Sequence, residues 1–151
     1  MKQRKIWILG VLLLGLSGCQ WEEEPTLAEL YAGTYRGKLE VLSPLEGMPT
    51  NGQVDMVVAG DRELRLKFIN MELADKTIDT LVIPALLSLD GQNRLTGKRQ
   101  GIPWTGEKLA DAELEGKLVY GKSELTVYMN VGMGAATPEV QWVVKFQGTR
   151  K

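Results

Sequence analysis

This sequence predicts an all-β fold, an eight-stranded antiparallel up-and-down barrel, from three observations. From Gly33 onward, apolar residues recur at every second position, the period that gathers them on one face of a β-strand. Glycine, asparagine and aspartate separate these alternating segments, and no helical period lasts longer than one or two turns. Eight short segments with one apolar face each favour a barrel or a sandwich, and a closed barrel leaves no strand edge exposed.

The expected strands follow one another as a meander. Pro84 lies inside the fourth strand, where we expect a bulge or an interruption of the hydrogen-bond ladder, because proline has no amide hydrogen. By residue number the strands are 33–42, 53–59, 63–68, 77–89, 95–100, 111–119, 123–131 and 138–149.

The links between these strands predict two different ends for the barrel. The links after the second, fourth and sixth strands are tight, and the other links are long. Alternate links of a meander lie at opposite ends, so the long loops would surround one open mouth. Both chain termini would lie at the opposite, closed end. The long links are residues 43–52, 70–76, 101–110 and 132–137.

Four glycines share the inward parity of their strands: Gly37, Gly97, Gly116 and Gly148. Glycine weakens a strand, so we expect a compensating reason at these positions. One explanation is that small barrels use glycine to bend strands around corners. The other is that the missing side chains leave interior space for a ligand.

Residues 1–18 have the character of a secretory signal peptide. A basic head precedes an apolar run that is too short to span a bilayer. The segment Leu16-Ser17-Gly18-Cys19 resembles the lipobox of bacterial lipoproteins. This resemblance implies that Cys19 carries lipid such as palmitate and that residues 1–18 are removed. The alternative is an ordinary signal peptide followed by a cysteine by chance.

Residues 19–30 are expected to form an acidic tether. Glu22-Glu23-Glu24 favours an extended, solvated chain, because like charges repel. An acidic cluster after a lipidated cysteine also resembles the surface-export signal of some Gram-negative lipoproteins, and both interpretations stay open. Gln20 agrees, again by resemblance, with sorting to the outer membrane. The capping-box spacing of Thr26-Leu27-Ala28-Glu29 predicts a single helical turn.

Charge and composition argue against several classes of partner. The chain has 18 basic and 19 acidic residues, and removal of residues 1–18 would leave 15 basic and 19 acidic, a net charge of −4. We therefore expect no nucleic-acid binding. An anionic membrane surface would not attract the protein either, so its attachment to a membrane would come from lipid. The single cysteine is Cys19, so no disulfide is expected within the barrel.

Catalysis is not expected either. The chain has no histidine, which removes Ser-His and Cys-His nucleophilic systems and the usual zinc sites. The acidic residues of the strands have outward parity, which favours a solvated surface over a carboxylate pair for acid–base chemistry. No segment has the spacing of an EF-hand loop. We expect no enzyme activity, no metal site and no cofactor.

Residues 31–151 resemble the calycins, which include the lipocalins and fatty-acid-binding proteins. Gly33-Thr34-Tyr35 is similar to the Gly-x-Trp signature of their first strand, with Tyr35 in place of tryptophan. The resemblance implies a late arginine packed over this ring, and Arg150 could make that cation–π contact. The chain looks most like the calycin-like β-barrel domain of Gram-negative lipoproteins, which implies the fold but no activity. The matching segments are 32–37, 81–84, 114–118 and 144–148.

The open mouth is the expected ligand site. Its loops carry flexible or aromatic side chains that suit the recognition of apolar groups, but that would equally plug the barrel as core. Trp142 has inward parity and would line a pocket or fill the interior. Arg99 has the same parity, so it either meets an anion such as a ligand carboxylate or is solvated where its strand frays. The loop residues are Met48, Met71, Trp104 and Met133.

Two functions from different classes remain open at this point. One is a membrane-anchored lipoprotein of the outer membrane or cell surface that binds a small apolar or amphipathic ligand at the barrel mouth. The other is a non-catalytic scaffold with a filled barrel that recruits a protein partner through its loops. A dry interior cavity on the order of several hundred Å3 would favour the first.

Overall fold

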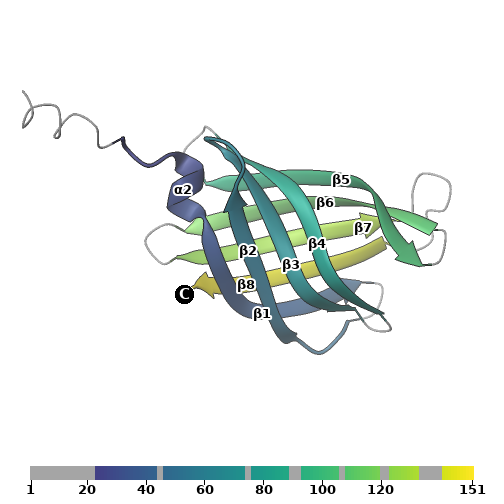
Figure 1. Ribbon diagram of the computed structural model, residues 1–151. Helices are drawn as coiled ribbons and strands as arrows, with labels where there is room; N and C mark the ends of the chain where they lie inside the picture. The colour runs from purple at the N-terminus through teal and green to yellow at the C-terminus, as the bar shows by residue number, and fades with distance from the viewer. Residues whose placement is uncertain are drawn as a thin grey trace, which may run out of the picture.

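The computed structural model describes residues 23–43, 46–73, 76–88, 93–105, 108–119, 123–132 and 141–151. Within them the chain forms a closed antiparallel barrel whose eight strands follow sequence order, and β8 pairs back with β1 (Figure 1). The predicted all-β up-and-down barrel is therefore confirmed. The elements are α2 Leu27–Tyr31, β1 Gly33–Ser43, β2 Thr50–Val58, β3 Glu63–Leu73, β4 Lys76–Leu87, β5 Arg94–Thr105, β6 Lys108–Val119, β7 Glu124–Gly132 and β8 Gln141–Arg150.

Two of the predicted long loops are in fact mostly strand. Two residues separate β3 from β4, and two separate β5 from β6, so the prediction of long links at 70–76 and 101–110 was wrong. Both segments begin near a residue with positive φ, Asn70 at 48° and Gly101 at 67°. Such a residue breaks the alternation of apolar and polar positions without ending the strand, which hid the strand in the sequence.

The start of the described chain and the C-terminus lie at one end of the barrel, as the meander requires. Helix α2 and the C-terminus are at the same end in Figure 1, together with the C-terminal ends of β2, β4 and β6. The opposite end carries the C-terminal ends of β1, β3, β5 and β7, and we call it the mouth end. The predicted contrast between long mouth loops and tight floor turns is not observed, because the β3–β4 and β5–β6 links are shorter than the floor links.

Helix α2 closes the floor of the barrel. Its N-terminus has the predicted capping box, in which Thr26 accepts from the Glu29 amide and the Glu29 carboxylate accepts from the Thr26 amide. The Ala28 amide donates to the Asp61 carbonyl in the β2–β3 link, at 2.9 Å. Ala28 and Tyr31 are buried against the barrel core. The short helix is therefore part of the folded domain.

Apolar side chains fill the described part of the interior. Most of them are residues that the period of two places inward, Met71 and Ile102 lie beyond the shifts of that period, and none is more than 6% exposed. Apart from Tyr31 and Tyr35, no residue with a polar or charged side chain is buried among the described ones. The largest fully buried side chains are Tyr35, Phe68, Phe146, Leu64, Leu66, Met71, Leu81, Ile83, Leu87, Leu95 and Leu114.

The inward glycines allow neighbouring strands to approach closely. Gly37 of β1 lies opposite Gly148 of β8, and a Cβ on Gly37 would collide with the carbonyl oxygen of Gln147. A Cβ on Gly97 would lie 2.5 Å from the carbonyl oxygen of Pro84. The space that these glycines leave is thus occupied by the backbone of the adjacent strand. This favours the bending of strands over a ligand cavity as the reason for glycine.

Candidate functional site

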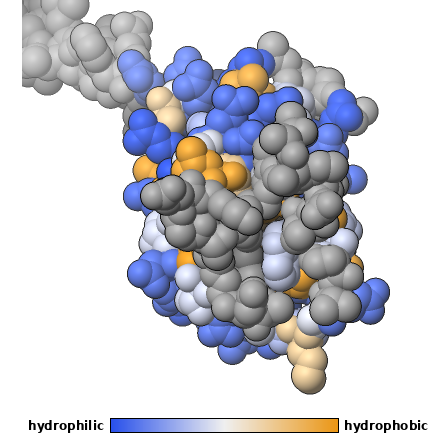
Figure 2. Space-filling view, turned by 90° about the vertical axis from the view of Figure 1, so that its right-hand side faces the viewer, coloured by the Kyte–Doolittle hydropathy of each residue, from blue (hydrophilic) through white to orange (hydrophobic). Residues whose placement is uncertain are grey.

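The mouth end places two of the expected ligand-site residues in or against the core. Met71 is 1% exposed, and Trp142 is partly buried and packs on the core cluster. Figure 2 views this end of the molecule and shows hydrophobic atoms between hydrophilic ones on the described surface. Met71 therefore plugs the barrel, whereas Trp142 keeps part of its surface open.

The other loop residues give no pocket within the described structure. Met48 precedes β2 and is 90% exposed. Trp104 belongs to β5 by its backbone, but its side chain lies outside the description, and Met133 lies outside the described residues altogether. The expected part of these three side chains in ligand binding therefore stays a prediction.

Arg99 bridges two strands. It lies in β5 beside an irregular register between Arg99 and Ile102, and its Nη1 donates to the carbonyl oxygen of Val82 in β4 at 2.9 Å. The side chain is partly buried. It is neither on a frayed strand end nor paired with an anion in this structure, because a backbone carbonyl is its hydrogen-bond partner.

The bond from Arg99 to Val82 crosses a gap in the barrel wall. β4 and β5 pair only through Ala85–Gly97, Leu86–Thr96 and Leu87–Leu95, near the floor. Beyond these pairs the two strands separate toward the mouth, as Figure 1 shows between the labels β4 and β5. We call this gap, between β4 residues 78–83 and β5 residues 98–103, the seam.

Pro84 explains why the pairing stops where it does. The Pro84 carbonyl is directed at Gly97 of β5, so the Pro84 nitrogen is also on the β5 side. That nitrogen has no hydrogen to donate, and the β4–β5 ladder therefore ends at this residue. The interruption expected at Pro84 is confirmed on the β5 side, while Pro84 still pairs with Arg65 of β3.

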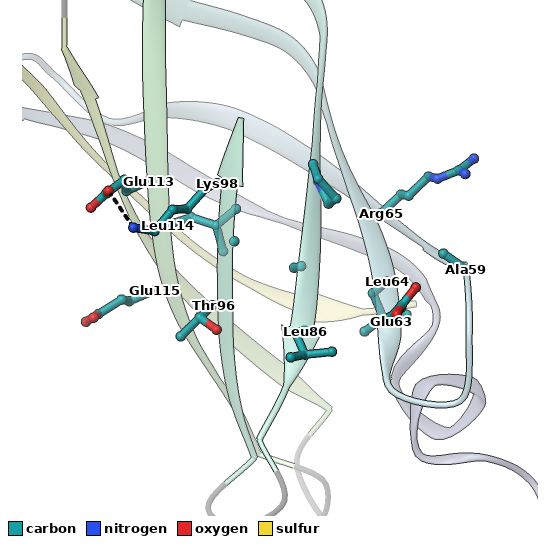
Figure 3. A pocket seen from close by; sticks show the side chains of 13 residues that line it. Ala59, Glu63, Leu64, Arg65, Leu86, Thr96, Lys98, Glu113, Leu114 and Glu115 are labelled. Atoms are coloured by element: carbon teal, nitrogen blue, oxygen red, sulfur yellow. Dashed lines mark ion pairs between the residues drawn. The ribbon is translucent and has the colours of Figure 1, made fainter. Parts of the chain in front are cut away.

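The hollows lined by described residues lie on the outer wall. The first, of about 630 Å3, runs over β3 to β6 and is lined by outward side chains such as Glu63, Leu86 and Thr96 (Figure 3). Lys98 and Glu113 form an ion pair of 2.9 Å at its edge, with both side chains more than half exposed. A second hollow, of about 620 Å3, continues over β5 to β7 and shares Thr96 and Glu115 with the first.

Tyr35, Arg150 and Gly33 form a tight group at the floor. The Tyr35 hydroxyl donates to the Tyr31 carbonyl at 2.8 Å, and burial raises the pKa of this phenol, partly offset by the charge of Arg150. Arg150 Nη1 donates to the carbonyls of Leu30 at 2.7 Å and Ala32 at 3.3 Å. The guanidinium thus binds the C-terminus of α2 in place of the expected cation–π contact with Tyr35.

Gly33 provides the room for that arginine. Its φ of 141° disfavours a side chain, and a Cβ there would lie 2.9 Å from Arg150 Cδ. The Gly-x-Tyr segment and Arg150 are therefore a structural unit that fixes α2 to β1 and β8.

The described chain shows no arrangement for metal binding or membrane crossing by a helix. No group of three or more acidic or cysteine side chains is close enough to hold a metal ion within it. No described helix has the length and apolar character that a membrane span requires.

Comparison with known proteins gives no relative: no family model and no curated protein matches the chain. The class that the fold and the site define is thus a small closed antiparallel β-barrel with an apolar interior, a helical plug at the floor and an open seam in its wall. The sequence did not predict the seam or the outer hollows. Pro84 was the one signal in the sequence that pointed toward the seam.

Proposed function

We propose that this protein is a lipid-anchored lipoprotein of the outer membrane or cell surface whose barrel is a non-catalytic scaffold for a protein partner. The observation that carries the proposal is the filled interior. Among the described residues, 21 inward side chains, spread over all eight strands, are no more than 2% exposed, including Phe68 and Phe146. A cavity that admitted water or a ligand would leave part of such side chains accessible.

Because side chains fill the barrel, a partner would have to bind to its outer wall or to its mouth end. The outer wall presents the two adjoining hollows and isolated exposed apolar residues such as Leu86 and Tyr128, surrounded by charges of both signs. Surfaces of this mixed kind suit protein partners, whose interfaces are about as apolar as ordinary protein surface. The absence of histidine and the outward position of the acidic residues agree with a role other than catalysis.

The anchor supports a definite orientation of the scaffold. The lipobox-like segment ends at Cys19, and α2 begins only a few residues later, at the floor of the barrel. A lipid on Cys19 would hold the floor toward the membrane and leave the mouth end and the seam facing away. The eight-stranded barrel agrees with the fold that the resemblance to calycin-like lipoprotein domains implies.

Two experiments test this function. Metabolic labelling with a palmitate analogue should mark the wild-type chain and not the Cys19→Ala variant, and equal labelling would contradict the anchor. Native mass spectrometry of the detergent-purified protein should show the bare polypeptide with its anchor. A small molecule bound at one copy per chain would overturn the filled-scaffold proposal.

Ligand binding at the mouth is the second candidate function. The seam and the partly exposed Trp142 favour it separately, because the seam would offer a side entry between β4 and β5 and Trp142 keeps apolar surface accessible in β8. Arg99 would then offer a cation to an amphipathic ligand. Thermal stability across a panel of fatty acids and bile acids tests this: a shift that Trp142→Ala abolishes would support it, and no shift would count against it.

A further inference from the structure

We propose that the edge of β4 at the seam binds an extended peptide carrying a carboxylate, which joins the barrel wall as an additional strand. The proposal rests on the proposed scaffold function and names the chemistry of the partner. It begins from the seam, where β4 and β5 run unpaired beyond Pro84. Unpaired strand edges are templates for the addition of another strand.

The hydrogen-bonding groups of β4 that face the seam can be assigned. The carbonyl of Val82 accepts from Arg99 of β5, so Val82 turns its N–H and C=O toward the seam. The Leu87 amide, of opposite parity, donates to Arg62 on the β3 side, which agrees with this assignment. Thr80, two residues before Val82, therefore also presents its N–H and C=O to the seam.

The two edges of the seam differ in how they are protected. β5 contains a bulge between Arg99 and Ile102 and then Pro103, both of which prevent regular pairing. The β4 segment Thr77–Ile83 contains neither proline nor glycine and is rich in β-branched residues. Proteins usually block a free edge with such devices, and β4 is the edge that has none between Thr77 and Ile83.

Arg99 indicates the charge of the peptide. Its guanidinium is partly buried at the seam and donates to a neutral carbonyl. The neighbouring Lys98 is already paired with Glu113. A peptide carboxylate opposite Val82 would replace this carbonyl as the acceptor of Arg99, so that a guanidinium–carboxylate ion pair with the geometry of a bidentate bond could form. The carbonyl of Val82 would then accept from the peptide backbone.

The space beside β5 is open enough for a chain to enter. No atom of a described residue lies within 4 Å of the position where a Cβ of Gly101 would stand. Thr80 and Gln100, which lie on opposite edges of the seam, are exposed. The inward Leu81 and Ile83 are buried. An added strand would therefore bind through its backbone at the edge of β4, and its side chains would not enter the core.

A synthetic peptide provides the test on the full-length chain in detergent. The probe is a blocked, fluorescent peptide of alternating threonine and valine with a central aspartate, about seven residues long, the usual length of a strand. Fluorescence anisotropy should show saturable binding. A peptide with alternate backbone nitrogens methylated should bind about tenfold more weakly or worse, because it loses its edge hydrogen bonds. Equal binding of the methylated peptide would overturn the proposal.

One pair of protein variants and one double-substitution cycle, of peptide aspartate against Arg99, locate the site. Thr80→Pro removes the N–H that faces the seam and should weaken binding about tenfold, whereas Thr80→Ala keeps it and should bind within about twofold of wild type. Circular dichroism checks that both variants are folded. Replacement of the peptide aspartate by asparagine should weaken binding to wild type, and this difference should vanish in Arg99→Gln.

The outcomes separate this inference from the scaffold function. The seam proposal is wrong if no probe binds, or if Thr80→Pro folds and binds like Thr80→Ala. An aspartate preference that persists in Arg99→Gln would also contradict it. None of these results would show a bound small molecule, which is what would overturn the scaffold function.

Discussion

Tyr35 and Arg150 lie opposite each other in the β1–β8 pairing, and both use their polar atoms to hold helix α2. The hydroxyl of Tyr35 donates to the carbonyl of Tyr31, and the guanidinium of Arg150 donates to those of Leu30 and Ala32. The last turn of the helix has free carbonyls that need donors. The pair therefore joins the floor helix to the first and last strands, where the barrel closes.

Tyr35→Phe should lower the free energy of unfolding by about 1–2 kcal/mol, because it removes a buried hydrogen bond and leaves the Tyr31 carbonyl without that donor. Chemical denaturation monitored by tryptophan fluorescence measures the change. Tyr128→Phe is a matched control, since Tyr128 is 46% exposed on the outer wall and should change stability by less than about 0.5 kcal/mol. Equal losses in the two variants would contradict this role of Tyr35.

Tyr35 should also make stability fall with rising pH in the alkaline range. Burial raises its pKa above the ordinary value of 10.0, so the folded state keeps a proton that the unfolded state loses. The contribution of Tyr35 to the free energy of unfolding is complete below the ordinary pKa of 10.0 and is lost as the pH rises from there through the raised pKa of the folded state. The difference in unfolding free energy between wild type and Tyr35→Phe should therefore shrink above pH 10.0. A difference that stays constant with pH would contradict it.

Arg150→Ala should loosen α2 and cost about 1–2 kcal/mol, because two carbonyls at the end of the helix lose their donor. Hydrogen exchange at the amides of Leu30 and Ala32 should accelerate more than exchange in β4. Arg36→Ala is the control, since Arg36 is exposed on the same strand pair and should leave both measurements nearly unchanged. Protection of α2 that survives Arg150→Ala would contradict the role of Arg150.

Much of the fold could be predicted from the sequence because burial on one face imposes a period of two. The alternation of Leu64, Leu66 and Phe68 with charged residues is typical of a strand, and all three are buried. The capping box of α2 was equally readable, because it depends on residues three positions apart. Local sequence patterns were therefore sufficient to predict an element wherever its backbone is regular.

The prediction failed where the backbone departs from the regular strand. Asn70 and Gly101 have positive φ, so apolar and polar positions change places beyond them and the strand looks like a loop. The seam was missed for another reason: Pro84 showed that the ladder would be interrupted, but only the pairing shows that β5 is the neighbour affected. The partner of Arg99 likewise depends on a contact between strands, which one sequence does not encode locally.

Gly37→Ala should be strongly destabilising, by about 3 kcal/mol or more, because its Cβ would collide with the backbone of β8 and the strands cannot separate without breaking the ladder. Gly47→Ala is the matched control. A Cβ there would make an ordinary contact of 3.7 Å with Val41, so stability should change by less than about 0.5 kcal/mol. Thermal unfolding of both variants makes the comparison, and a mild effect at Gly37 would show that the barrel closure tolerates a wider strand spacing.

The filled interior predicts a large difference between two leucines on adjacent strands. Leu66 of β3 is fully buried, so Leu66→Ala should cost about 2–5 kcal/mol, from lost burial and from the cavity that rigid neighbours leave. Leu86 of β4 is 43% exposed on the outer wall, and Leu86→Ala should cost less than about 1 kcal/mol. Denaturant titration of both variants measures the contrast. If Leu66 lined a ligand cavity, its truncation would enlarge a space already present and cost little, so similar small losses in both variants would refute the packed barrel and the scaffold function built on it.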